Sequence, residues 1–258
     1  MKNLHTIAPV LLLALALAPR AGAQGSAGAN AAIEPRYLVD VPTAGVLAHA
    51  AFAFDFEFYQ SDGMLAGLSF GLFNRVILGI SYGGTHIIGT ESPSWNKHAG
   101  MAIKIRFLDE TDALPAISLG YSSQGKGAYV DSLQRYRTKS PGLYAVASKN
   151  YRLLGFFSVH GGINYSLERH DGSTGLNAFA GAEKSLGPFA AAVAEYNFGL
   201  DDNNGGALGE GKGYLNAGLR ASIGGGFTLG LYLKDIIQNQ QNVSFGDRTI
   251  QIEYISRL

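Results

Sequence analysis

The sequence contains no cysteine among its 258 residues. This absence excludes disulfide bonds, thiolate metal sites and the lipid-modified cysteine on which a lipoprotein anchor is built. An exported chain of this length without disulfides must be stabilised either by its own core or by a membrane.

An excess of charge of either sign is also missing. Lysine and arginine total 20, aspartate and glutamate total 20, and the net charge is zero at neutral pH. No block of basic residues interrupts this balance. The composition therefore predicts no nucleic-acid partner.

Long apolar runs are missing too, apart from one near the N-terminus. The run IAPVLLLALALAP follows Lys2 and precedes the small residues Ala21-Gly22-Ala23. A membrane-spanning helix needs roughly 20 apolar residues, so this run is too short to be one. A positive start, a short apolar stretch and a small-residue triplet are typical of a secretory signal. We expect residues 1–23 to be a signal peptide, cleaved before Gln24.

After Gly45 the sequence alternates with a period of two. In AFAFDFEFY, residues 51–59, phenylalanines occupy every second position and Ala53, Asp55 and Glu57 lie between them. A strand places successive side chains on opposite faces, so the aromatic and acidic residues separate completely. The same sorting recurs in residues 76–82, 101–107, 117–121, 157–166, 215–220, 227–234 and 250–254.

Weaker alternation elsewhere brings the total to about twelve strands, an even number as in bacterial single-chain barrels. Short turns alternate with longer loops, as they do on the two sides of a membrane barrel. We therefore expect an all-β fold over residues 44–258, a closed antiparallel transmembrane β-barrel with both termini in the periplasm. A soluble all-β periplasmic domain is the alternative. Tyrosines near strand ends are expected in the interfacial girdles: Tyr59, Tyr82, Tyr121, Tyr144, Tyr196 and Tyr254.

Residues 24–43 show no clear period and contain two prolines. We expect an N-terminal leader there. It is either a periplasmic tail or a segment tucked into the mouth of the barrel.

The polar faces of the expected strands carry charges of both signs, which would project into the lumen. These residues are Asp55, Glu57, Lys104, Arg106, Glu183, Glu195, Arg220, Lys234 and Glu253. They either line a water-filled passage or form a network that seals a narrow barrel, and we favour pairing because confined charges need partners. Closure brings the first strand beside the last ones, so we expect Asp55 and Glu57 to pair with Lys234 and Arg220. The lumen is then closed or nearly closed at rest.

The expected loop at residues 122–140 carries four basic residues, Lys126, Arg135, Arg137 and Lys139. Such a cluster on the cell surface could contact lipopolysaccharide phosphates or another polyanion. A simply solvated loop is the favoured interpretation.

An enzyme that acts on lipid or peptide, of the deacylase or protease type, is the alternative to a non-enzymatic barrel. Ser158 and His160 share the polar face of one strand, and Glu168 follows them. Two residues of rise separate Ser158 from His160 by about 6.6–6.8 Å, so direct contact is not expected. No His, Asp or Glu cluster has the spacing of a metal site. We expect neither catalysis, nor a metal, nor a cofactor.

Several stretches together resemble the YjbH-like outer-membrane barrels, across most of residues 35–258. They are EPRYLVDVPTAGVL, SYGGTHIIG, PAISLGYSSQGKGAY, KSPGLYAVASKNY, HGGINYSLE and GYLNAGLR. The resemblance implies a location in the outer membrane of a Gram-negative-type bacterium and a role in exopolysaccharide export or assembly. It also implies contacts with outer-membrane lipids, lipopolysaccharide, the barrel insertion machinery and polysaccharide.

Overall fold

The computed structural model describes residues 25–258, except 205 and 242–246, so the expected signal peptide at residues 1–23 lies outside it. The strands in chain order are β1 (Ala51–Tyr59), β2 (Gly63–Leu72), β3 (Val76–Thr85), β4 (Ser94–Trp95), β5 (Gly100–Leu108), β6 (Ala116–Ser122), β7 (Lys126–Val130), β8 (Arg135–Thr138), β9 (Gly142–Arg152), β10 (Phe156–Tyr165), β11 (Asn177–Ser185), β12 (Ala190–Asn197), β13 (Tyr214–Gly224), β14 (Phe227–Lys234) and β15 (Asp247–Arg257). Within these described ranges, no helix is long and apolar enough to cross a membrane.

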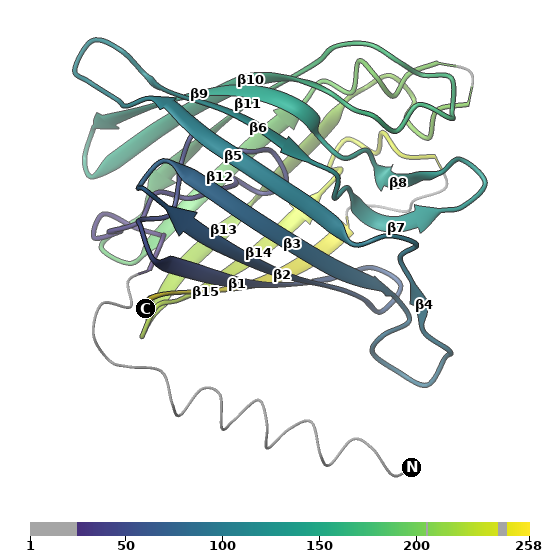
Figure 1. Cartoon of the computed structure of the whole chain (residues 1–258), viewed down its shortest axis with the longest axis horizontal. Helices are drawn as coiled ribbons and strands as arrows, with labels where there is room; N and C mark the ends of the chain where they lie inside the picture. Colours follow the sequence, from purple (N-terminus) through teal and green to yellow (C-terminus); the bar gives the residue numbers. More distant parts are fainter. Residues whose placement is uncertain (1–24, 205, 242–246) are drawn as a thin grey trace.

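Twelve of these strands form one closed antiparallel barrel (Figure 1). The closure joins the two ends of the chain, because β1 pairs with β2 on one side and with β15 on the other. Asp55 thus lies opposite Gly67 of β2 and opposite Glu253 of β15. Closure leaves no free sheet edge, as a strand structure in a bilayer requires. The expected barrel and its strand number are confirmed.

The outer wall is apolar. Large side chains exposed on it include Phe54, Ile80, Met101, Ile105, Leu119, Ile163, Leu219, Leu231 and Ile250. They come from strands all around the barrel and occupy the face that the two-residue alternation assigns to the outside. An apolar band of this kind is the lipid-facing surface of a membrane barrel, and far exceeds what a soluble monomer exposes.

The two ends of the barrel differ. At the short-turn end, tight connections such as residues 73–75, 153–155 and 225–226 join neighbouring strands. At the long-loop end lie β4, the β7–β8 hairpin and the loops 166–176 and 198–213. Figure 1 shows the C-terminus at the short-turn end and the β7–β8 hairpin at the opposite end.

Residues 25–50 enter the barrel, and we call this segment the plug. It starts at the short-turn end, where the N–H groups of Ala29 and Asn30 donate to the carbonyls of Gly187 and Pro188, at 2.8 and 2.9 Å. The chain turns back at a bridge between Tyr37 and Pro42. It returns to the short-turn end, where the N–H of Ala50 donates to the carbonyl of Gly71 at 3.0 Å.

The barrel wall therefore begins at Ala51 rather than at residue 44. The plug also corrects the expected aromatic girdle. Tyr144 faces the interior and packs in one buried cluster with Val146 of its own strand and Leu38 of the plug. Tyr59 is buried as well, and its hydroxyl donates to the carbonyl of Gly84 at 2.8 Å. Tyr144 points inward because the plug supplies apolar surface inside the lumen, which the strand pattern alone does not reveal.

Candidate functional site

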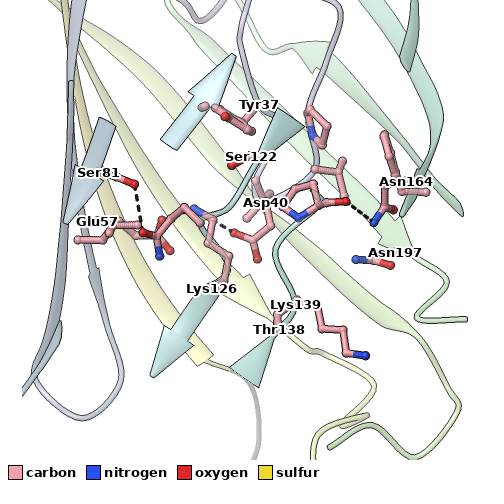
Figure 2. Close-up of a pocket in the computed structure, with 18 of the residues that line it drawn as sticks. Tyr37, Asp40, Glu57, Ser81, Ser122, Lys126, Thr138, Lys139, Asn164 and Asn197 are labelled. Atoms are coloured by element: carbon pink, nitrogen blue, oxygen red, sulfur yellow. Dashed lines mark hydrogen bonds and ion pairs between the residues drawn. The ribbon is translucent and has the colours of Figure 1, made fainter. Parts of the chain in front are cut away.

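A ring of four charges joins the plug, the wall and the β7–β8 hairpin near the middle of the molecule. Lys234 Nζ lies 2.5 Å from Glu57 Oε1 and 2.7 Å from Asp40 Oδ1. Lys126 Nζ lies 2.5 Å from Glu57 Oε2 and 3.6 Å from Asp40 Oδ1. Figure 2 shows Lys126 of the hairpin between Asp40 and Glu57. Each cation contacts both carboxylates, so the ring is neutral and its desolvated charges are compensated.

The strand register explains this arrangement. Glu57 lies on β1 and Lys234 on β14, and the two strands are neighbours of the same strand, β15. The structure thus contains the wall pair Glu57–Lys234 that closure predicts. The predicted pairing of Arg220 with Asp55 or Glu57 is not present.

A second cluster of charged residues, which includes Asp55 of β1, lies nearer the short-turn end. Arg36 of the plug lies 2.7 Å from Asp55 and 2.9 Å from Glu253. Arg220 lies 3.2 Å from Glu183 and 3.8 Å from Glu253. Asp55 pairs with Arg36 because the plug lies between β1 and Arg220, and a sequence pattern confined to the wall does not include Arg36.

The other predicted lumen charges bind the main chain of the plug. The Glu195 carboxylate on β12 accepts hydrogen bonds from the N–H groups of Val39, Asp40 and Val41, at 2.8, 2.9 and 3.1 Å. Lys104 on β5 donates to three plug carbonyls. Arg106, also on β5, donates to the carbonyl of Ala44 at 2.9 Å and pairs with Glu34. All nine predicted lumen charges therefore lie inside the barrel and contact the plug or another charge.

The four basic residues predicted to form a surface cluster do not lie together on the surface. Lys126 belongs to the ring. Arg135 is fully buried, with Nη1 2.6 Å from Asp171 and 2.5 Å from Asp202. Lys139 lies 2.9 Å from Asp171. Arg137 alone of the four is exposed. A polyanion site over these residues is wrong, because aspartates of the neighbouring loops already neutralise Arg135 and Lys139.

These contacts make the β7–β8 hairpin a lid, by which we mean residues 123–141. Asp171 comes from the loop between β10 and β11, and Asp202 from the loop between β12 and β13, so Arg135 ties three loops together. Glu168 adds a further tie by accepting the N–H groups of Tyr136 and Ser140, at 3.3 and 2.8 Å. Burial raises the pKa of Glu168 to about 7.

Two cavities flank the ring, of about 120 and 250 Å³. The smaller one is bordered by Asp40, Lys126 and the side-chain amides of Asn164, Asn177 and Asn197 (Figure 2). The larger one lies between the lid and β14 and is bordered by Lys126, Arg137 and Lys234. Both cavities are large and polar enough to hold water, whose share of liquid volume is about 30 Å³ per molecule.

The candidate catalytic residues do not meet. Ser158 donates to Asn150 at 2.5 Å, and His160 Nδ1 lies 2.8 Å from the hydroxyl of Ser148. Glu168 lies in the lid contacts described above. Among the residues that the structure describes, no group of three His, Cys, Asp or Glu side chains is placed to hold a metal ion.

Sequence reasoning missed Arg36, Asp40, Asp171 and Asp202. Each lies outside the alternating segments, so the strand pattern gives it no position. Arg36 pairs with β1 and β15, and Asp40 pairs with β14 and the β7–β8 hairpin, and these pairings follow only once the leader is inside the lumen.

Comparison with solved structures places the fold among outer-membrane barrels. A structure described as "KdgM porin" matches with a TM-score of 0.51 and 11% sequence identity, covering 79% of this chain and 98% of that chain. A structure described as "KdgM porin in complex with disordered oligogalacturonate" gives a TM-score of 0.50 and 12% identity over the same shares of the two chains. Comparison with protein-family models and with curated protein sequences gives no match.

Proposed function

We propose that this chain is a non-enzymatic barrel of the outer membrane of a Gram-negative-type bacterium and allows limited solute passage when its plug moves. The plug, which crosses the lumen between β5 and β12, carries the proposal. Outer-membrane barrels have short turns on the periplasmic side and long loops outside the cell, so the short-turn end faces the periplasm and the lid faces the outside. The apolar outer wall contacts lipid, the loops contact lipopolysaccharide, and the barrel insertion machinery places the chain in the membrane.

Polar contacts and an apolar cluster together hold the plug, since Leu38, Val39 and Val41 pack against Tyr144, Phe179 and Val193 of the wall. The polar contacts are the part of this binding that favours a removable segment over a permanent core. Its charged residues bind lumen charges, and its main chain binds Glu195, Lys104 and Arg106. Water can replace such hydrogen bonds at little net cost, whereas it cannot replace apolar packing. A lumen exposed by plug movement would present the charged residues of the wall beside an apolar patch that includes Tyr144, Phe179 and Val193. The charged part of this lumen would hold water.

A role in exopolysaccharide export or assembly is the finer proposal. It rests on the resemblance to the YjbH-like barrels and on the smaller cavity of about 120 Å³, which is bordered by Asn164, Asn177 and Asn197. The three amides bind one another and the main chain, so a sugar hydroxyl would replace some of these hydrogen bonds. Amide groups can both donate to and accept from sugar hydroxyls. One of the solved barrels of the same fold is described in complex with an oligogalacturonate.

Swelling of proteoliposomes tests solute passage. We expect slow swelling with mono- and disaccharides for the intact chain and fast swelling for a variant without residues 26–46. This deletion keeps Leu47, which packs on Ala53 and Ile255 of the wall. Both proteins should show heat-modifiable mobility on gels and fractionate with the outer membrane. Equal swelling of the two folded proteins, or recovery of the chain as a soluble periplasmic protein, would contradict the proposal.

Deletion of the chain from its host tests the finer role. Export of polysaccharide predicts less polymer at the cell surface and recovery by the intact chain. Unchanged surface polysaccharide would restrict the function to other solutes.

A further inference from the structure

The lumen wall binds the main chain of the plug as well as its side chains. On β12, the Glu195 carboxylate accepts the N–H groups of three consecutive residues, 39–41. On β5, Lys104 Nζ donates to the carbonyls of Arg36, Thr43 and Gly45, at 2.8, 3.0 and 3.1 Å. An anion therefore faces the donors of the plug main chain and a cation faces its acceptors.

Ala44 shows the same recognition at a single residue. Its N–H donates to the hydroxyl of Ser148 at 2.8 Å. Its carbonyl accepts from the Ser118 hydroxyl at 2.9 Å and from the Arg106 guanidinium at 2.9 Å. An alanine has no side-chain group that could specify these contacts, so the wall binds the peptide unit itself.

Main-chain N–H and C=O groups are present in every polypeptide. A saccharide offers hydroxyls, but it lacks a run of N–H donors with the spacing of consecutive peptide units. Hydrogen bonds to charged groups are stronger than those between neutral groups. Here the charged side chains of the wall bind main-chain groups, which carry no sequence information. Any polypeptide segment that forms the same turn offers the wall the same main-chain groups.

We propose that the lumen wall is a binding site for the main chain of a polypeptide hairpin turn, and that residues 36–45, which form such a turn, occupy this site in cis. The inference rests on the proposed function, because a second polypeptide can enter only when the plug has left. Glu195, Lys104 and Arg106 are the binding residues. The ligand class is a peptide segment of about ten residues, entering from the end where the plug enters.

Current block in planar bilayers tests the inference. The barrel without residues 26–46 is reconstituted, and a synthetic peptide with the sequence of residues 33–47, IEPRYLVDVPTAGVL, is added to the short-turn side. We expect the peptide to block the ionic current. Glu195→Gln and Lys104→Met should each weaken the block by about tenfold or more, the order expected for loss of charged hydrogen bonds.

A matched peptide separates main-chain recognition from side-chain recognition. N-methylation at Val39 and Val41 removes two donors to Glu195 and keeps every side chain, and it should weaken the block about as much as Glu195→Gln. N-methylation at Glu34 is the control, because among the described contacts its N–H donates to no wall residue. A block unchanged by methylation at Val39 and Val41 would overturn main-chain recognition.

The failure of this inference is distinguishable from failure of the proposed function. A plug-free barrel that conducts, but that an oligosaccharide blocks and the peptide does not, retains solute passage and overturns the peptide site. If the plug-free barrel does not insert into a membrane, trypsin cleavage of the full chain after Arg36 tests the inference instead. Arg36 is buried, with 3% of its surface exposed. Glu195→Gln should raise that cleavage at least several-fold while the strands stay protected. Unchanged protection would overturn the inference.

Discussion

Lys234 on β14 binds Asp40 at the tip of the plug, with Nζ 2.7 Å from Oδ1, although 194 positions separate the two residues in the sequence. The same ammonium group binds Glu57 of β1 at 2.5 Å. One lysine thus joins the plug to the wall on both sides of the barrel closure. Lys126 of the lid contacts the same two carboxylates, so movement of the plug and movement of the lid involve the same charges.

Replacing Lys234 by methionine should open the lumen. The substitution keeps most of the side-chain volume and leaves Glu57 and Asp40 with one cation, Lys126, so the ring carries a net negative charge. Removing one partner of a buried ion pair costs roughly 3–5 kcal/mol, and here it weakens the binding of the plug to the barrel wall. We expect higher conductance with cation selectivity, measured in planar bilayers as a shift of the reversal potential across a salt gradient.

Lys212→Met is the matched control for that substitution. Lys212 pairs with Glu210 in a loop, and both side chains are about half exposed, at 49% and 46%. Exposed pairs contribute roughly 0–1 kcal/mol, so stability and conductance should stay near those of the intact chain. Equal behaviour of the Lys234 and Lys212 variants would show that the ring does not hold the plug.

Replacing Arg135 by methionine should release the lid. Asp171 and Asp202 would lose a partner that is fully buried between them, and uncompensated buried carboxylates are costly. We expect faster amide hydrogen exchange in residues 126–138, with unchanged protection of the barrel strands. Arg137→Met, which alters the exposed basic residue of the same hairpin, should leave exchange unchanged. A lid that exchanges equally in both variants would contradict the assignment.

The lid should also loosen as the pH rises towards neutrality. Burial raises the pKa of Glu168 from 4.5 to about 7, so the folded lid favours the neutral acid. The stability that this group contributes is fully present below the ordinary pKa and is lost as the pH rises through about 7. Hydrogen exchange of residues 136–140, corrected for intrinsic rates, should therefore accelerate between about pH 4.5 and 7 beyond that of barrel amides, and level off above that range.

Glu168→Gln removes the titrating group and keeps an oxygen acceptor for one of the two N–H groups, since Tyr136 and Ser140 bind separate carboxylate oxygens. The variant should show no such pH step. If the intact chain and the variant show the same pH profile, Glu168 does not control the lid.

The barrel could be predicted from the sequence because the alternation that specifies each strand is a local feature of the chain. The alternation of Phe52, Phe54, Phe56 and Phe58 with Asp55 and Glu57 sorts the two faces of β1 before any tertiary contact is known. The placement of Glu57 and Lys234 near one another also follows from closure, since the first and last strands of a barrel are neighbours. The lumen charges could be predicted for the same reason, since they lie on the polar faces of the alternating strands.

A segment tucked into the barrel mouth was one of two alternatives for the leader, but the contacts of the plug and the lid could not be predicted. These contacts are long-range and lie outside the alternating strands. Arg36 has no strand position, and its partners Asp55 and Glu253 are fixed only when the chain enters the lumen. The polar loop around Arg135 predicts a surface residue. Its burial depends on Asp171 and Asp202, which other loops bring to it. Inward tyrosines such as Tyr144 were misplaced because apolar surface inside the lumen is supplied by Leu38.

The most direct test of the account is the single-channel conductance of the intact chain beside that of the variant without residues 26–46, both shown to be folded by heat-modifiable mobility. A closed lumen predicts little or no steady current through the intact chain, with rare brief openings, and stable open channels through the plug-free barrel. Steady conductance through the intact chain at the level of the plug-free barrel would contradict the claim that the plug closes it.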